Sequence, residues 1–283
     1  MATKDVCVIG ADIGAGSSKL CTGKTSYRFP TTIHQGDSPM NEIHTATFSQ
    51  QIAVDVKVGG HEFHHDPAGV PILTGTSDFI TSPARVAAFW AGVARAGLLS
   101  EYRNFKVYAS IPYNRLHLPD GKPNMSTVDA IKAAFQLPVE IKGLDGVQPR
   151  ISEIMLLAEG ITGAIDYFFE LTASLDIKTR VDNSSNMKIA VFGIGFSTVD
   201  FITARGTAIQ MKDSRINYDC AVNHFLDLLK QRLITDKVIT DGYDASMLIS
   251  AIETGKLKVR GTPIDIEKYI VECRDNWVKK LSL

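Results

Sequence analysis

Hydrophobic and polar positions follow a strand-like pattern in two separate stretches of the chain, and each stretch contains a glycine-rich turn. Val6 to Ile9 is a short β-branched run, and Leu20 to Cys21 begins a second strand after the loop GADIGAGSSK. The segment MKIAVFGIGFSTVDFITARGTAIQ, which starts at Met187, repeats this order of strand, glycine turn and strand. Short apolar runs bounded by glycine are typical of buried strands. Both loops are therefore predicted to turn hairpins rather than to open helices.

The rest of the chain alternates between strand-like and helical periodicity. QIAVDVKVGGHEFHH predicts a hairpin about its Gly-Gly pair, FKVYASIP predicts a buried strand, and Ile154 to Leu157 predicts another. Ser126 or Thr127 is expected to cap one helix and Asp265 another, because short oxygen-bearing side chains accept hydrogen bonds from free N–H groups. Apolar residues at helical spacing predict helices at 83–98, with Trp90 in the core, and at 125–135, 217–234, 244–257 and 264–281.

A strand hairpin followed by helices occurs twice, which predicts an α/β protein with two domains. The first is expected at 1–160 and the second at 161–283, joined by a helix near 160–175. With 283 residues, of which 45% are hydrophobic and 22% charged, the chain is long enough for two such cores.

Composition narrows the class of protein further. The net charge of −1 gives no electrostatic case for direct contact with nucleic acid or membrane. No apolar run reaches the ~20 residues of a membrane span, and the N-terminus lacks the pattern of a signal peptide. The four cysteines are widely spaced, so reduced thiols and a cytoplasmic location are predicted.

The first glycine loop has the composition of a phosphate-binding loop. Backbone N–H groups in a tight glycine turn can approach phosphate oxygens closely, Lys19 adds a positive charge, and Asp12 can orient a hydrated Mg²⁺. The spacing fits neither G-x-x-x-x-G-K-[ST] nor G-x-G-x-x-G. Taken alone, the loop fits a plain hairpin turn as well as a phosphate loop. The second loop, GIGFSTVD, also combines glycines with hydroxyls and a carboxylate, so the pair is expected to face each other across a cleft and clamp one polyphosphate.

Four segments in order resemble one family. DIGAGSSK and GIGFSTVD resemble the phosphate 1 and phosphate 2 loops of the actin, sugar-kinase and DnaK-type chaperone superfamily. VYASIPYNRLHLPDGKPN and EIMLLAEGITGAIDYF resemble the corresponding segments of the bacterial actin-like ParM/StbA plasmid-segregation family. The resemblance runs from about Val6 to Trp277. It implies two actin-like (ribonuclease H-like) α/β domains flanking a nucleotide cleft, with ATP or GTP and Mg²⁺ as ligands.

The resemblance also implies roles for single residues. Glu159 would orient the water that attacks the γ-phosphate, whereas without the resemblance a glutamate favourably placed at a helix start is the preferred interpretation. Asp12 and Asp200 would hold Mg²⁺ through water. Contacts with phosphate are expected from Asp12, Gly14, Ala15, Gly16, Ser17, Lys19, Gly193, Gly195, Ser197 and Thr198.

Two features depart from the family's pattern. Gly193 stands where phosphate 2 begins with an aspartate, which puts metal affinity and the hydrolysis rate in doubt. The chain stops at DNWVKKLSL, before the expected adenosine-contacting glycine turn, so domain II is expected to lack that segment, with truncation favoured over a differently completed site. The expected function is nucleotide-driven filament assembly with slow hydrolysis for plasmid segregation, with the chain's own copies and a DNA-binding adaptor as partners. The alternatives are a monomeric small-metabolite kinase and a non-catalytic scaffold.

The cluster HEFHHD invites a zinc interpretation. Alternation along a hairpin would place His61 and His64 on opposite faces, and no second ligand cluster has metal-like spacing. An exposed strand and loop is therefore the favoured prediction.

Overall fold

The computed structural model divides into two compact units, each described by itself. Unit 1 comprises Met1–Val191 and Phe201–Ser214, and unit 2 comprises Phe192–Asp200 and Arg215–Leu283. The domain boundary expected after residue 160 stays a prediction. The structure describes residues 6–14, 16–36, 53–65, 77–144, 148–160, 165, 167, 169–171, 177–179, 186–205, 208–210, 213–217, 220–240, 242–243 and 245–281.

The central sheet of unit 1 contains five strands in the order β3-β2-β1-β7-β9. The first three form an antiparallel meander, whereas β7 and β9 run parallel to β1. The predicted strand and hairpin are confirmed, with the first strand continuing past Gly10 to Ile13. The bounds are β1 (Cys7–Ile13), β2 (Ser17–Cys21), β3 (Ser26–Pro30), β7 (Asn104–Ile111) and β9 (Arg150–Ala158).

A second sheet of unit 1 contains four antiparallel strands in the order β4-β6-β5-β8. The predicted Gly-Gly hairpin is confirmed as the β5–β6 turn. Gly59 and Gly60 have φ of 58° and 87°, which glycine adopts at little steric cost. The bounds are β4 (Ile33–Gln35), β5 (Val54–Val58), β6 (His61–His65) and β8 (Val139–Ile141).

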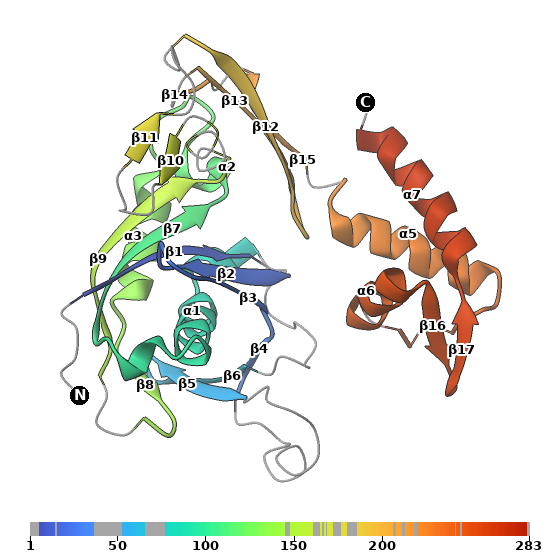
Figure 1. The fold of residues 1–283 in the computed structure, drawn as a ribbon, viewed down its shortest axis with the longest axis horizontal. Coiled ribbons are helices and arrows are strands. Elements are labelled where there is room, and N and C mark those ends of the chain that lie inside the picture. The colour runs from blue at the N-terminus through green and yellow to red at the C-terminus, as the bar shows by residue number, and fades with distance from the viewer. Residues whose placement is uncertain are drawn as a thin grey trace. The chain divides into compact units, whose positions relative to one another are not determined.

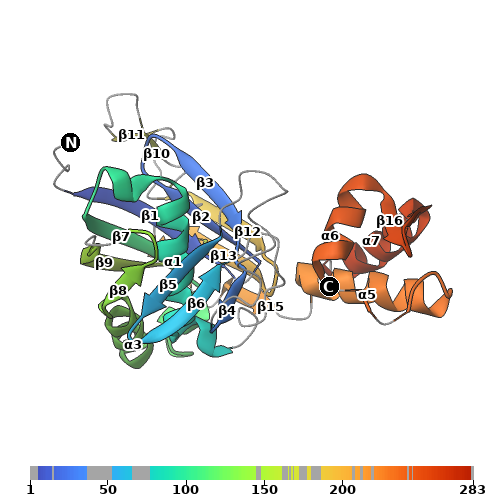
Figure 2. The same cartoon turned by 90° about the horizontal axis from the view of Figure 1, so that it is seen from below.

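Helix α1 (Pro83–Arg95) lies between these two sheets and contacts strands of both (Figures 1 and 2). Ser82 caps it, and Pro83 is its first residue, a position that suits proline. Its residues from 84 to 93 are all buried, which is typical of a helix covered on every side. Trp90 is in the core, as predicted. Gly92 leaves room for the Phe29 ring, since a Cβ there would lie 2.0 Å from the ring's Cζ.

Four shorter helices and a small hairpin complete the described part of unit 1 before residue 186. The predicted helix at 125–135 is confirmed, but its cap is Asn124, whose Oδ1 accepts from the Thr127 N–H, rather than Ser126 or Thr127. The helix expected near 160–175 falls largely outside the described residues, and 169–171 form a strand instead. The bounds are η1 (Ser77–Thr81), η2 (Leu98–Ser100), α2 (Tyr113–Leu116), α3 (Met125–Phe135), β10 (Phe169–Leu171) and β11 (Ile177–Thr179).

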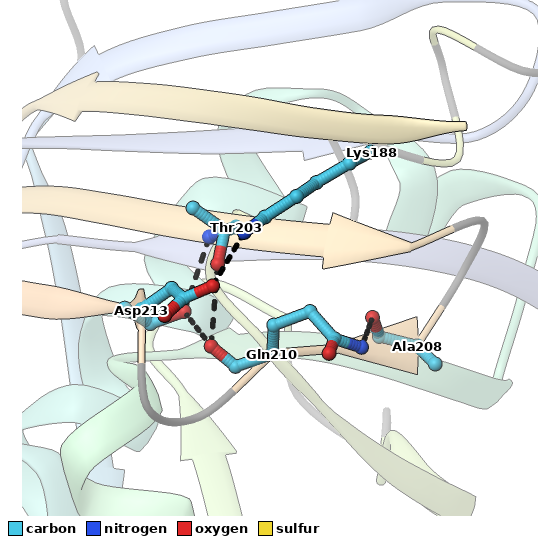
Figure 3. Close-up of polar contacts among 6 residues, drawn as sticks. Lys188, Thr203, Ala208, Gln210 and Asp213 are labelled. Carbon is cyan, nitrogen blue, oxygen red and sulfur yellow. Dashed lines mark hydrogen bonds and ion pairs between the residues drawn. The ribbon is translucent and has the colours of Figure 1, made fainter. Parts of the chain in front are cut away.

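A four-stranded sheet begins with the second predicted hairpin, and the division between the units passes through its first two strands. Figure 3 shows polar contacts at the end of this sheet where β12 begins and β13 ends. The Thr203 hydroxyl donates to the Gln210 carbonyl at 3.2 Å, and Lys188 pairs with Asp213 at 2.5 Å. The bounds are β12 (Lys188–Ile194), β13 (Val199–Arg205), β14 (Ala208–Ile209) and β15 (Arg215–Asn217).

Unit 2 packs three amphipathic helices and a hairpin around one apolar core that includes Leu229, Leu233 and Ile266. The predicted cap is confirmed, since the Asp265 Oδ1 accepts from the Glu267 N–H at 2.9 Å. The β16–β17 hairpin was not predicted. The bounds are α5 (Val222–Thr235), α6 (Ala245–Thr254), β16 (Lys256–Val259), β17 (Thr262–Asp265) and α7 (Glu267–Leu281).

The structure also bears on two expectations from composition, which concern membrane-spanning segments and disulfides. None of the helices described is long and apolar enough to cross a membrane. None of the four cysteines forms a disulfide; three of them are buried and Cys21 is exposed.

Candidate functional site

The first glycine loop is a tight turn that closes the β1–β2 hairpin. The Gly14 N–H donates to the Ser17 carbonyl at 3.2 Å. A Cβ on Gly14 would lie 3.1 Å from that carbonyl oxygen, so glycine allows the close approach. The Gly16 carbonyl accepts from the Thr31 N–H at 3.3 Å, which ties the turn to the next segment. Ala15 lies outside the described residues.

The hairpin brings Asp12 and Lys19 together as cross-strand partners. The Lys19 Nζ lies 3.1 Å from the Asp12 Oδ2, and the two side chains are 57% and 37% exposed. Exposed ion pairs contribute about 0–1 kcal/mol. Lys19 can therefore leave Asp12 at little cost when another anion is offered.

The second glycine loop closes the β12–β13 hairpin in the same way. The Gly195 N–H donates to the Thr198 carbonyl at 2.8 Å, and a Cβ on Gly195 would again lie 3.1 Å from that oxygen. The carbonyls of Gly195 and Phe196 accept from the N–H groups of Val222 and Asn223 at 3.1 and 2.9 Å. The first turn of α5 therefore fixes the orientation of this loop.

Asp200 is the carboxylate of the second hairpin, and it is only 6% exposed. The Thr198 hydroxyl donates to its Oδ2 at 3.1 Å, while its Oδ1 has no hydrogen-bond partner among the described residues. Burial raises the pKa of Asp200, although the Thr198 hydrogen bond opposes this. A Cβ on Gly193 would lie 3.8 Å from the Asp200 Cβ, so the position of the missing aspartate is directly opposite. An orphaned buried oxygen of this kind fits a hydrated cation.

Glu159 follows the carboxyl end of β9 at the same sheet edge as Asp12. Asp12 pairs with Ser110 of β7, and the Glu159 N–H donates to the Ile111 carbonyl at 2.8 Å. Ligand sites of parallel α/β sheets lie at this carboxyl edge. Gly160 keeps φ at 85°, and a Cβ there would lie 2.6 Å from the Ile202 Cγ1, so the backbone beside Glu159 is sterically fixed.

A buried charged residue, missed by the sequence analysis, lies beside this edge. Arg85 of α1 is 1% exposed, and its Nη2 donates to the Ser110 carbonyl at 2.9 Å. Burial lowers the pKa of Arg85 to about 10, while the charges of Glu159 and Asp12 act in the opposite direction. Its sequence signal was faint: one arginine in an alanine-rich helix is normally placed on the solvent side.

The histidines of β6 are not on an exposed strand, and that prediction is wrong. His61 is exposed, but His64 and His65 are buried. The His64 Nδ1 lies 2.5 Å from the Asp55 Oδ1, and the His65 Nε2 lies 3.0 Å from the Pro30 carbonyl. Among the residues that the structure describes, no group of three or more His, Cys, Asp or Glu side chains is arranged for a metal.

The predicted site residues therefore fall into two local groups. Asp12, Gly14, Gly16, Ser17 and Lys19 share the first hairpin, with Glu159 at the same sheet edge. The second hairpin carries Gly193, Gly195, Ser197, Thr198 and Asp200. Their roles toward phosphate, metal and water stay predictions.

No protein-family model matches the sequence, and no curated protein matches it. Solved structures match nearly its whole length. The apo ParM protein of pSK41 has a TM-score of 0.61 at 12% identity, covering 99% of this chain and 80% of that chain. An archaeal actin homologue has a TM-score of 0.70 at 13% identity, covering 97% and 80%. A ParM from a 15-stranded Clostridium botulinum filament has a TM-score of 0.65 at 16% identity, covering 98% and 82%. The chain has the actin-like α/β fold, as predicted.

Proposed function

We propose that this protein binds ATP or GTP with Mg²⁺, hydrolyses it slowly, and assembles head to tail into filaments that segregate plasmid DNA in the cytoplasm. The observation that carries the proposal is the equivalence of the two glycine hairpins. Each is closed by a glycine N–H that donates to the carbonyl of the hydroxyl residue three positions later, at 3.2 Å for Gly14 and 2.8 Å for Gly195. A polyphosphate needs several backbone donors at once, and two such turns supply them.

The hairpins differ in the charges that they offer to a bound nucleotide. Lys19 exchanges Asp12 for a phosphate oxygen, because both side chains of this ion pair are partly exposed. If Mg²⁺ is bound, the orphaned Oδ1 of Asp200 would accept a hydrogen bond from a water on the metal, and Asp12 would do the same once Lys19 had moved. Mg²⁺, when bound, neutralises phosphate charge. Gly193 supplies no carboxylate, so this metal shell has one protein anion fewer.

Glu159 is proposed to orient the attacking water. Its backbone is fixed by the hydrogen bond to Ile111 and by the crowding of Gly160 against Ile202. A carboxylate on a backbone fixed in this way can accept a hydrogen bond from water and align it for in-line attack. Loss of the γ-phosphate removes contacts with the hairpins. A conformation of the protein that depends on those contacts is then destabilised.

Assembly is proposed by analogy with proteins of the same fold. The Clostridium botulinum ParM is solved as a filament. Head-to-tail contacts that do not close into a ring produce open helical polymers. The net charge of −1 favours an indirect contact with DNA through a DNA-binding adaptor protein.

The test combines sedimentation, electron microscopy and phosphate release on the full chain with Mg-ATP, Mg-GTP or no nucleotide. Wild-type protein is expected to sediment above a threshold concentration only with nucleotide. Glu159→Gln is expected to form filaments that persist while phosphate release falls at least tenfold. Glu153→Gln is the matched control, because Glu153 lies on β9, the strand that Glu159 follows, in an exposed ion pair with Lys106 and should behave as wild type.

Three outcomes contradict the proposal. The scaffold alternative is supported if sedimentation is the same with and without either nucleotide and calorimetry detects no nucleotide binding. Phosphate release that appears only with an added metabolite supports a kinase. Equal loss of hydrolysis in Glu153→Gln and Glu159→Gln removes the role given to Glu159.

A further inference from the structure

Arg85 is a charged residue inside a helix whose neighbouring positions are almost entirely apolar. It is 1% exposed, between the buried residues Ala84 and Val86. Its Nη2 donates to the Ser110 carbonyl at 2.9 Å and its Nη1 to the Ile80 carbonyl at 3.4 Å. The Nε has no hydrogen-bond partner among the described residues. Hydrogen bonding therefore satisfies this guanidinium only in part.

Burial of a guanidinium lowers the stability of the folded protein unless anions lie nearby. Desolvation of a charge costs several kcal/mol in a protein interior, and an apolar residue of similar volume is often as stable or more stable. Among the described residues, Glu159 and Asp12 are acidic groups whose charges act on Arg85. Both are partly exposed at the carboxyl edge of the sheet, whereas Arg85 is beneath the surface.

The strand register explains how one arginine acts on both carboxylates. Ser110, which receives the Nη2 hydrogen bond, is the direct neighbour of Asp12 on β1. The next residue, Ile111, accepts the hydrogen bond from the Glu159 N–H. The end of β7 that Arg85 holds is therefore the end that joins the backbones of both acidic residues.

We propose that Arg85 is a positioning residue, which anchors the carboxyl end of β7 and supplies the fixed positive charge that holds Asp12 and Glu159 at one sheet edge. This inference rests on the proposed function for its catalytic consequence. Two like-charged carboxylates repel each other, and an internal cation offsets that repulsion without occupying the exposed side where metal and water bind. Arg85 itself does not touch the nucleotide.

The catalytic test compares Arg85→Met, Arg85→Lys and wild type in the full chain. Arg85→Met is expected to lower kcat for phosphate release at least tenfold and to change KM and nucleotide affinity less than threefold. Arg85→Lys keeps the charge and is expected to retain at least a third of kcat. Arg95→Met, in the last turn of the same helix, is the matched control and should match wild type.

A second test needs no nucleotide and keeps the inference separate from the proposed function. Thermal melting is measured for Arg85→Met, Glu159→Gln and the double variant. If Arg85 offsets carboxylate repulsion, Glu159→Gln leaves Tm unchanged or lower in wild type but raises it by about 2–4 °C in the Arg85→Met background.

The kinetic and melting results each support or overturn the positioning role of Arg85. Additive Tm changes overturn the inference, as does an Arg85→Met variant that hydrolyses at the wild-type rate. Parallel loss of Tm, affinity and kcat without rescue by lysine indicates a purely structural arginine and also overturns it. A coupled Tm cycle in a protein that binds no nucleotide supports the positioning of the carboxylates while the proposed function fails.

Discussion

The two glycine hairpins have the same backbone closure but carry their carboxylates on opposite strands. Two residues before the turn, the first hairpin has Asp12 and the second has Gly193; two residues after it, the first has Lys19 and the second has Asp200. In each hairpin these two residues lie opposite one another. Each hairpin therefore has one carboxylate, before the turn in one case and after it in the other.

The surroundings of the two carboxylates differ more than their positions. Asp12 is partly exposed and has its own cation in Lys19, so the first hairpin is locally neutral. Asp200 is buried with Thr198 as its donor, and an oxygen is left without a partner among the described residues. A buried anion without a cation favours proton uptake or an external cation. Under the proposed function, the second hairpin would therefore depend more strongly on Mg²⁺ than the first.

The largest effect is expected from Gly193→Asp, which gives the second hairpin two facing carboxylates. The added Cβ would lie 3.8 Å from that of Asp200. Repulsion of like charges at this separation is expected to lower the free energy of unfolding by about 2 kcal/mol without metal. Urea unfolding in EDTA and in Mg²⁺ measures the loss, which Mg²⁺ should reverse. Gly193→Asn is the matched uncharged variant, and an equal loss in it would show that charge is not the cause.

Asp200→Asn is expected to have a smaller effect of the opposite sign. Burial raises the pKa of Asp200 above the ordinary 3.8, so the folded state disfavours its ionised form at neutral pH. Asparagine removes this cost and should raise the free energy of unfolding, by less than the loss expected in Gly193→Asp. The folded state takes up the proton more readily than the unfolded chain, so the gain should shrink as pH falls toward about 4.

Urea unfolding from pH 4 to 8 checks this sign. Asp12→Asn is the matched variant in the first hairpin, and it should show no gain at neutral pH because it breaks the pair with Lys19. Mg²⁺-dependent nucleotide binding should fall in Asp200→Asn. A stabilisation that does not change with pH would show that the Asp200 charge is not its source.

Local patterns predicted both hairpins because the turn chemistry and the alternation are short-range. Gly14 and Gly195 are needed for backbone reasons that the neighbouring residues reveal. The same holds for α1, whose apolar residues at helical spacing predicted the helix, although its Ser82 cap was not predicted. The sequence also predicted the actin-like fold, because the order of several weak motifs is more specific than any one of them.

Tertiary burial accounts for most of what the sequence did not predict. Arg85 and His65 are polar, yet both are buried because α1 and β6 are covered by other elements. No periodicity within a helix or strand carries that information. The β16–β17 hairpin was overlooked for a different reason: its turn places a non-glycine residue, Arg260, at φ 48° before Gly261.

Equal and modest losses are expected from Gly14→Ala and Gly195→Ala. In both turns the new methyl would lie 3.1 Å from a carbonyl oxygen that accepts the closing hydrogen bond. Each turn must open by a few tenths of an ångström, at a cost of about 1 kcal/mol and a clear loss of nucleotide affinity. Gly242→Ala is the control, since a Cβ there meets nothing within 4 Å. Unequal losses in binding would mean that only one hairpin contacts phosphate.

The smallest change in stability is expected from Lys19→Met, although its effect on binding should be large. The Asp12–Lys19 pair is exposed, so its loss should alter the free energy of unfolding by less than about 0.5 kcal/mol. Nucleotide affinity should fall about tenfold, and its dependence on salt should weaken, because one positive charge near phosphate is lost. Calorimetric titration at two salt concentrations measures both. Lys122→Met breaks a comparable exposed pair with Asp120 and should change neither quantity. If the two variants bind nucleotide equally well, Lys19 serves only to neutralise Asp12, and the first hairpin is a turn rather than a phosphate loop.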